Sequence, residues 1–310
     1  MKSKIIRRLR DEREILSGEA LSTDLGVSRV SVWKHIRQLQ EMGYGIDSAP
    51  KGYRLTDTPD VLWPWEFPGR EERIHYFPET GSTMTVARKM ARNGCPAFTV
   101  VIAGQQTGGR GRLQRKWLSD DGGLYFTVVV RPEIPPVLSS RISFVASLSL
   151  AGVLRKQFGV NAQVKWPNDI LVDEKKLTGM LSEMETDADM VSFVNIGMGI
   201  NVNNDPTPDE SRATSLARLL GRTVPRRAIL AAFLDDFEAR MAQVDYDTVI
   251  GEWKEFTLTL GRRVRIVTTS ETYEGRAADV EKDGTLILEL GDGTRKSVIF
   301  GDCFLQPPGE

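Results

Sequence analysis

The most distinctive stretch of the chain runs Gln106-Thr107-Gly108-Gly109-Arg110-Gly111-Arg112-Leu113-Gln114-Arg115-Lys116-Trp117. Its three glycines allow the backbone to approach a ligand closely and to adopt conformations closed to other residues. Four of the seven residues from 110 to 116 are cationic, and guanidinium groups bind carboxylates and phosphates through two hydrogen bonds at once. The spacing is not that of a P-loop. The stretch therefore predicts an anion-binding loop, with a mobile surface loop or an RNA-binding arginine patch as the alternatives.

Three later segments place polar residues beside predicted strands. The first reads Lys165-Trp166-Pro167-Asn168-Asp169. Its lysine, amide and carboxylate suit a nucleotide with Mg²⁺, although a capped turn between two strands is an equally good interpretation. The second, Lys175-Lys176-Leu177-Thr178-Gly179-Met180-Leu181, has lysines before a buried strand, where a solvated charge is the simpler interpretation. The third, Gly197-Met198-Gly199-Ile200-Asn201-Val202-Asn203, has glycines that invite a ligand or mark a β-bulge.

The N-terminal segment, from Met1 to Leu55, predicts a helix-turn-helix followed by a small hairpin. Residues 3–16 form the first predicted helix, with the apolar residues Ile5, Ile6, Leu9 and Ile15. A short helix ends at Gly26, and Ser28 is suited to cap a longer one that ends before Gly43. Residues 44–55 fit a hairpin wing. Eleven Lys and Arg against seven Asp and Glu give this segment a net charge of +4, so the rest carries −5. Such a basic head favours a nucleic-acid partner, with a solvated basic face as the alternative.

Downstream of residue 73, predicted strands and helices alternate, which is typical of an α+β domain with a mixed sheet. The predicted strands are 75–77, 98–103, 124–130, 164–166, 170–172, 177–183 and 193–201, and the predicted helices are 83–93, 142–158 and 228–244. Four short strands follow at 263–267, 274–280, 285–290 and 295–300, and they favour a small β-barrel. We therefore predict a winged helix-turn-helix at 1–58, a linker at 59–72, a central domain at 73–258 and a small barrel at 259–310.

Scarce residue types narrow the chemistry of this chain. Cys95 and Cys303 are its only cysteines, and His35 and His75 are its only histidines. They provide neither a disulfide framework nor a zinc site, and neither histidine lies in a motif that suggests a Ser-His-Asp triad. No apolar stretch approaches the length that a membrane span needs, and the basic N-terminus lacks the apolar core of a signal peptide. We expect a cytoplasmic protein with no membrane partner, whose chemistry depends on Arg, Lys, Asp and Asn.

Taken together, these motifs resemble those of the biotin protein ligase family. The family has an S-T pair, Q-x-x-G-R-G-R followed by K-W, then K-W-P-N-D, K-L-x-G and G-x-N-x-N. This chain matches them with Ser82-Thr83, Gln106–Arg112, Lys116-Trp117, Lys165–Asp169, Lys176–Gly179 and Gly199–Asn203. One departure is Met84, where the family often has Asn. The resemblance extends through the helix-turn-helix and the C-terminal strands, so it covers nearly the whole chain.

The resemblance implies a bifunctional, repressor-type member of the family. It implies a catalytic domain of the biotin/lipoate ligase type and a C-terminal SH3-like β-barrel. The implied activity forms biotinoyl-5'-AMP from biotin and MgATP and transfers biotin to a lysine of the biotin carboxyl carrier protein of acetyl-CoA carboxylase. Biotin-responsive repression at an operator DNA, by a homodimer that the adenylate promotes, is implied as well. A lipoate-type ligase and a ligand-sensing repressor without catalysis are the alternatives.

The resemblance also assigns roles to residues of this chain. Lys176 and Arg112 are the expected catalytic residues. The expected biotin-binding residues are Ser82, Thr83, Met84, Gln106, Arg110, Gly111, Arg112, Lys176 and Gly179. The expected residues around ATP and Mg²⁺ are Arg112, Arg115, Trp117, Asn168, Asp169 and Asn201, with Asp169 as the metal ligand. On the predicted second helix of the head, Ser28, Arg29, Ser31, Lys34 and His35 are the expected DNA-binding residues.

Overall fold

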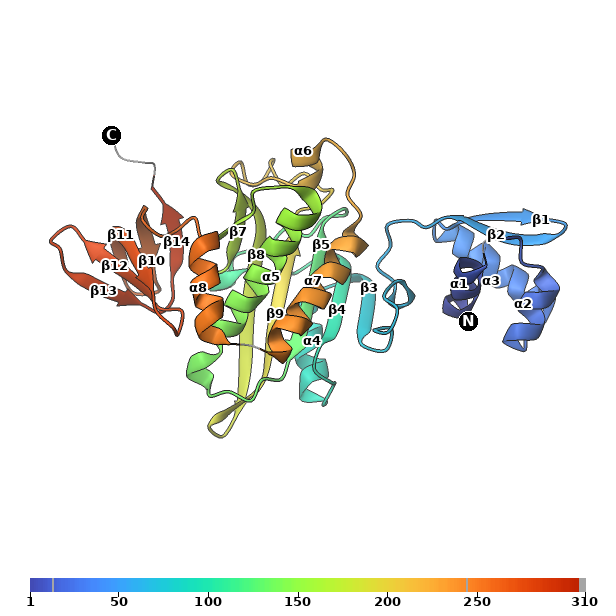
Figure 1. Cartoon of the computed structure of the whole chain (residues 1–310), viewed down its shortest axis with the longest axis horizontal. Coiled ribbons are helices and arrows are strands. Elements are labelled where there is room, and N and C mark those ends of the chain that lie inside the picture. Colours follow the sequence, from blue (N-terminus) through green and yellow to red (C-terminus); the bar gives the residue numbers. More distant parts are fainter. Residues whose placement is uncertain (13, 244, 307–310) are drawn as a thin grey trace. The chain divides into compact units, whose positions relative to one another are not determined.

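The computed structural model describes residues 1–12, 14–243 and 245–306. The chain divides into two compact units, Met1–Pro68 and Gly69–Glu310 (Figure 1). The first unit contains α1 (Lys2–Asp11), α2 (Gly18–Leu25) and α3 (Arg29–Glu41), followed by the antiparallel hairpin of β1 (Gly45–Ala49) and β2 (Gly52–Asp57). This is the predicted winged helix-turn-helix. Gly26 ends α2 in the left-handed conformation (φ 63°), and the Ser28 hydroxyl accepts a hydrogen bond from the Ser31 amide at 3.2 Å.

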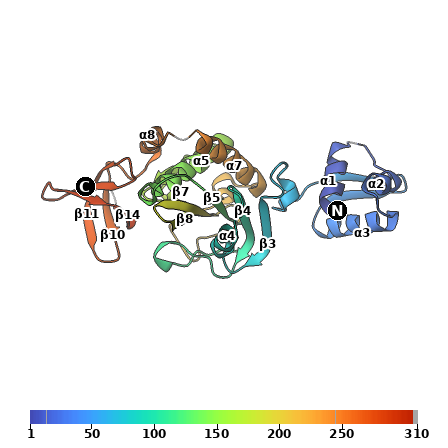
Figure 2. The ribbon, with the colours of Figure 1, turned by 90° about the horizontal axis from the view of Figure 1, so that it is seen from below.

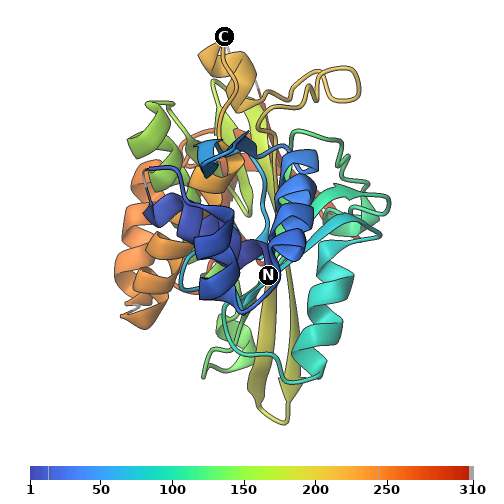
Figure 3. The ribbon, with the colours of Figure 1, turned by 90° about the vertical axis from the view of Figure 1, so that its right-hand side faces the viewer.

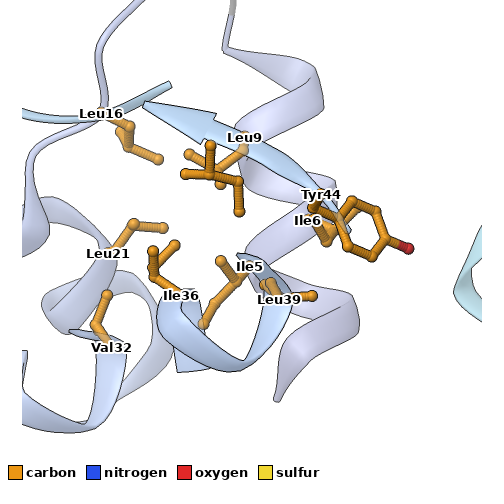
Figure 4. Close-up of a cluster of buried hydrophobic side chains, with 10 residues drawn as sticks. Ile5, Ile6, Leu9, Leu16, Leu21, Val32, Ile36, Leu39 and Tyr44 are labelled. Carbon is orange, nitrogen blue, oxygen red and sulfur yellow. The ribbon is translucent and has the colours of Figure 1, made fainter. Parts of the chain in front are cut away.

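One apolar core holds the three helices and the wing together. The side chains in Figure 4 converge from α1, α2, α3 and the wing. They are Ile5, Ile6, Leu9, Leu16, Leu21, Val32, Ile36, Leu39, Tyr44 and Ile46. The prediction that the first helix continues to residue 16 is wrong, because α1 ends at Asp11. Ile15 is 44% exposed, and its neighbour Leu16 is buried instead, where its backbone pairs with Tyr53 of the wing.

The first part of the predicted linker packs against the winged helix. Val61 and Trp65 contact its core, and residues Pro64–Glu66 form a short 3₁₀ helix. The buried carboxylate of Glu66 accepts hydrogen bonds from Tyr44 and Arg10, at 2.5 and 2.6 Å. These contacts attach the segment to α1 and to the short stretch between α3 and β1. The domain boundaries of the sequence analysis remain predictions.

The second unit contains a seven-stranded mixed sheet in the order β3-β4-β5-β9-β8-β7-β6. Its strands are β3 (Ile74–Thr80), β4 (Thr99–Gln106), β5 (Leu124–Val130), β6 (Gln163–Lys165), β7 (Asp169–Val172), β8 (Lys175–Asp187) and β9 (Met190–Ile200). Only β3 and β4 run parallel among these pairs. The long β8–β9 hairpin extends beyond the rest of the sheet (Figure 3).

Helices cover both faces of this sheet, as Figure 2 shows. α4 (Thr83–Arg92) lies on one face, and α5 (Ser140–Phe158) and α7 (Arg226–Ala242) lie on the other. Successive side chains along β5 point to opposite faces of the sheet, which explains this arrangement. Phe126 packs its ring against Phe233 of α7, whereas Thr127 donates a hydrogen bond to Thr83 at the start of α4. Pro136–Phe158 is apolar and long enough to span a membrane, but 67% of its apolar window is buried, as in a core helix.

The C-terminal segment forms a five-stranded antiparallel sheet in the order β13-β12-β11-β10-β14. Its strands are β10 (Arg263–Val267), β11 (Thr272–Val280), β12 (Leu286–Leu290), β13 (Arg295–Val298) and β14 (Asp302–Leu305). Two helices precede it, α6 (Leu216–Leu220) and α8 (Tyr246–Phe256). The Trp166 indole donates to the carbonyl of Gly284 at 3.0 Å, so this β-domain is fastened to the central sheet. The sequence analysis missed α6, α8 and β14.

Candidate functional site

The start of α4 and the end of β4 meet through the side chain of Gln106. Its Oε1 accepts hydrogen bonds from the Thr83 amide at 2.8 Å and the Thr83 hydroxyl at 3.2 Å. Its Nε2 donates to Ser119 at 2.9 Å. The neighbouring Ser82 hydroxyl is buried and has no hydrogen-bond partner among the described residues. Because an unpaired buried hydroxyl is costly, a ligand that hydrogen-bonds Ser82 is favoured here.

The glycine- and arginine-rich loop at 107–117 folds back on itself next to Gln106. Arg110 and Lys116 pair as a β-bridge, and the Gly111 amide donates to the Arg115 carbonyl at 2.7 Å. Gly109 must lack a side chain, because a Cβ there would lie 2.4 Å from the Trp117 carbonyl oxygen. The Arg110 guanidinium lies 3.9 Å from Glu183 of β8. The glycines therefore permit a tight loop that presents its backbone and its arginines next to Gln106.

The Trp117 indole lies on a glycine cradle formed by Gly179 and Gly199, which face each other across β8 and β9. A Cβ at Gly199 would lie 2.3 Å from Trp117 Nε1, and one at Gly179 would lie 2.6 Å from its ring. The indole Nε1 is buried without a hydrogen-bond partner in the described part of the chain. The cradle thus admits a flat ring and leaves a donor for an acceptor that the protein does not supply.

Lys176, Lys165 and Asp169 form a compact charge cluster beside Trp117. The Lys176 Nζ lies 2.9 Å from Asp169 Oδ1 and 5.5 Å from the centre of the Trp117 ring, and the Lys165 Nζ lies 3.2 Å from Asp169 Oδ2. Burial acts to raise the pKa of Asp169, but the two ammonium groups outweigh it and hold that pKa below its ordinary value. The cluster therefore contains two cations and one carboxylate, and it has a net positive charge.

The β-domain contributes a carboxylate to the loop. The Arg115 Nη2 lies 2.6 Å from Asp302 Oδ2, and the two groups form an ion pair. Burial lowers the pKa of Arg112, while the charges of Asp302 and Asp169 oppose that shift. An arginine stays protonated at any physiological pH, so Arg112 is a half-buried cation close to both carboxylates. Burial also raises the pKa of the neighbouring Cys303 thiol to about 12, so this cysteine is chemically inert near neutral pH.

The remaining predicted residues lie around this region with partners of their own. The Asn168 amide donates to the Met180 carbonyl, and the Asn201 side chain accepts from Asn204 at 3.1 Å. Met84 is 4% exposed and packs against Gly197, where a Cβ would lie 2.6 Å from its sulfur. Met84 therefore supplies an apolar surface beside β9.

A chain of contacts runs from Gln106 through Ser119 and Trp117 to Lys176. It connects an uncharged hydrogen-bonding end, a glycine cradle and a cationic end. Such a site suits an elongated ligand that has a polar neutral head and an anionic tail. Among the described residues, no group of three His, Cys, Asp or Glu side chains could hold a metal ion. A metal ion here would therefore need ligands from an anionic substrate in addition to those of the protein.

In the first unit, α3 turns Val32, Ile36 and Leu39 to the core. Arg29 and Lys34 are exposed, whereas Ser31 and His35 are half-buried, and the His35 Nδ1 is buried without a partner among the described residues. Some of the predicted DNA-binding residues are therefore exposed on α3, and others lie at the edge of its buried face.

Sequence profiles of three families match the chain in order. The profile described as HTH domain matches residues 2–54, Biotin/lipoate A/B protein ligase family matches 76–203, and Biotin protein ligase C terminal domain matches 259–306. The bifunctional ligase/repressor BirA of Bacillus subtilis is 36% identical over 91% of this chain and 92% of its own. The chain belongs to the bifunctional ligase/repressor BirA family. The Escherichia coli member is 27% identical over 94% of both chains.

The solved structures agree with membership of the BirA family. The biotin protein ligase from Aquifex aeolicus in complex with biotin and ATP is 28% identical, with a TM-score of 0.65 over 76% of this chain and 99% of its own. The protein is thus a biotin protein ligase with a helix-turn-helix repressor domain. The predicted family, fold class and enzyme class are confirmed.

Ser119 and Asp302 were missed by the sequence analysis as ligand-site candidates, and the ion pair of Lys165 was not foreseen. Lys165 lies in a quoted motif, but its pairing with Asp169 depends on the β6–β7 turn. Ser119 stands two residues after Trp117, and only its burial beside Gln106 reveals its role. Asp302 lies in β14, far along the sequence from Arg115 in the loop, and no sequence signal joins them.

Proposed function

We propose that this BirA-family protein forms biotinoyl-5'-AMP from biotin and MgATP, then transfers biotin to a lysine of the carrier protein of acetyl-CoA carboxylase. The observation that carries the proposal is the continuous contact chain from the neutral Gln106 end to the cationic Lys176 end. Biotin has the matching polarity, with a neutral ureido ring at one end and a carboxylate at the other. The relatives named above are biotin ligases.

In this proposal the ureido ring is held by Ser82, Thr83 and Gln106. The unpaired Ser82 hydroxyl gains a partner, and the hydrogen bonds between Gln106 and Thr83 orient both residues. The apolar part of biotin lies along Met84 and beside the Trp117 ring that fills the glycine cradle, with the backbone of Gly111 and the side chain of Arg110 closing the loop side. The indole donor of Trp117 then meets an oxygen of biotin or of the nucleotide.

ATP is assigned to the cationic end. Arg112 and Arg115 reach it from the loop, and Asn168, Asp169 and Asn201 reach it from the ends of β6, β7 and β9. The carboxylate of biotin must attack the α-phosphorus while pyrophosphate leaves, so two anions approach each other. Lys176 and Arg112 neutralise this charge and align the reacting groups, and no general base is needed because a carboxylate is already a nucleophile.

The ion pairs of the charge cluster affect how Lys176 neutralises phosphate charge in this step. Lys176 shares its charge between Asp169, at 2.9 Å, and the phosphate, and Lys165 also stabilises that carboxylate. Mg²⁺ fits this site only as part of MgATP, because Asp169 is the single carboxylate that these motifs supply. When bound, Mg²⁺ supplies further neutralisation of phosphate charge.

The second step attaches biotin to the carrier protein. The amine of the acceptor lysine attacks the mixed anhydride, and AMP leaves with the electron pair of the broken bond. Until then the loop around Arg110 and Arg112 protects the adenylate from water. The loop also determines which amine reaches the anhydride.

The winged helix is assigned to operator DNA, with repression responsive to biotin. Its net charge of +4 supports this assignment, since phosphate contacts dominate DNA affinity. A dimer promoted by the adenylate extends the contact to a two-fold operator. We also infer a cytoplasmic location, because carrier protein and operator both reside there in a bacterial cell.

Purified protein, biotin, MgATP and a carrier domain test the transfer step. Mass spectrometry should find one biotin on a single lysine of the carrier, and AMP should form in equal amount. Lipoate in place of biotin serves as the control for the alternative lipoate-type ligase. Attachment of lipoate but not biotin would contradict the proposal, as would biotin binding without any transfer.

A further inference from the structure

Two large apolar side chains stand on the outward face of α3. Val30 is 62% exposed and Trp33 is 52% exposed. They are three residues apart on a helix whose Val32, Ile36 and Leu39 face the core, so they share one side. A single exposed apolar residue needs no explanation. An adjacent Val and Trp on the second helix of a helix-turn-helix is a surface that a partner could cover.

The charges around Val30 and Trp33 identify the partner. Arg29, Lys34 and Arg37 are exposed on the same helix, and no described carboxylate lies within ion-pair distance of any of them. The Arg37 guanidinium lies 6.0 Å from the centre of the Trp33 ring, a distance at which a cation and an indole attract each other. The face therefore combines free cations with a small apolar centre.

The major groove of DNA offers the complementary chemistry. Its walls are phosphates, and each thymine presents an apolar C5-methyl group in the groove. The N-terminal half of the second helix is the part that enters the groove in this motif, and Val30 and Trp33 lie there. A membrane surface fits less well, because it needs a wide apolar face, and the wide apolar face of α3 is already buried in the core.

We propose that Val30 and Trp33 read thymine methyl groups, while Arg29, Lys34 and Arg37 contact phosphates and fix the position of α3. This proposal rests on the operator function proposed above and adds the sequence class that the operator must contain. Three residues of helix advance about 4.5 Å, and neighbouring bases on one strand are about 3.4 Å apart. The two side chains therefore meet neighbouring base pairs, and each half-site carries adjacent thymines there.

Missing-methyl analysis tests this reading. The full-length protein, with biotin and MgATP, first selects its sites from a random pool of double-stranded DNA. Each thymine of a selected site is then replaced by deoxyuridine, which removes only the methyl group. We expect about four-fold weaker binding at one or two adjacent positions. Val30→Ala and Trp33→Ala should abolish this dependence, because the side chain that senses the methyl is gone.

Salt dependence separates base reading from phosphate contact. Trp33→Ala should weaken binding to the selected site by about ten-fold or more while leaving non-specific affinity and the salt slope unchanged. Lys34→Ala should weaken binding to all sequences and reduce the salt slope by about one. Ile15→Ala is the matched control, since Ile15 is a similarly exposed apolar residue of the same unit outside α3.

The outcomes are distinguishable. Deoxyuridine without effect at every position, or a Trp33→Ala variant that loses all sequences equally, would overturn the reading of thymine and leave the operator function standing. A wild-type protein that selects no DNA at all would overturn both. Unchanged adenylate formation in every variant shows that the substitutions act only on the DNA surface.

Discussion

Replacing Lys176 with methionine removes one of the two cations of the charge cluster but keeps a side chain of similar length beside Trp117. Lys176 reaches an oxygen of Asp169 at 2.9 Å, so it can reach a phosphate oxygen at a similar distance. At an effective dielectric constant near 20, unit charges 4 Å apart interact by about 4 kcal/mol. Part of that is offset because the charge of Lys176 is shared with Asp169. We expect a loss of about 3–4 kcal/mol in the transition state, or 10²–10³ in the rate of adenylation.

The assay for Lys176→Met is single-turnover pyrophosphate release at saturating biotin and MgATP. Biotin affinity should fall less than the adenylation rate, because the ureido end of the site is untouched. Lys175→Ala is the matched control, since Lys175 is exposed. A Lys176→Met enzyme with wild-type turnover would refute the role of this lysine.

Three further predictions concern the loop, the charge cluster and the head. The Arg112→Gly variant should release the adenylate, which would then biotinylate lysines indiscriminately, as mass spectrometry of bystander proteins would reveal. Strict selectivity for the carrier would show that Arg112 does not retain the adenylate. The ion pairs of Asp169 should stabilise the fold above its ordinary pKa, about 4, and lose this contribution as the pH falls through its lowered folded-state pKa. In the Asp169→Asn variant, the free energy of unfolding in urea should therefore fall less steeply with decreasing pH than in the wild type. The same pH dependence in both proteins would contradict the pairing. Deleting residues 1–68 should abolish DNA binding, measured by gel shift, but leave a folded ligase; a truncated chain that does not fold would mean that the two units share a core.

Local patterns predicted much of the fold. The strand at 124–130 was found with its observed bounds, because a run of β-branched and aromatic residues between glycine and proline signals leaves little choice. The turn of the helix-turn-helix was equally clear from Gly26 and Ser28. The sequence could not show that Leu16, and not Ile15, is the buried residue, since burial of Leu16 depends on pairing with the wing.

The missed elements are those whose stability comes from distant partners. α8 contains Gly251 and several β-branched residues, which weaken its helical signal, and Trp253 of α8 is buried against Phe144 of α5. β14 is very short, and it exists as a strand because it pairs with β10, the first strand of the β-domain.

In the candidate site, too, local motifs could be recognised from the sequence but contacts between distant segments could not. The motifs located Gln106, Trp117, Asp169 and Lys176 because family resemblance preserves residue types and spacing. The motifs did not reveal that Lys176 is paired with Asp169, or that Asp302 of the β-domain faces the loop. Such pairings are set by tertiary structure, and they determine how much of each charge is available to a substrate.

The most direct test of the account is adenylate formation from ATP labelled in its α-phosphate, with and without biotin. The account predicts that a labelled product appears only with biotin, that it stays bound to the protein, and that adding a carrier domain converts it to AMP. Absence of any biotin-dependent labelled product, with biotin and ATP both shown to bind, would contradict the assignment of this site as the centre of adenylation.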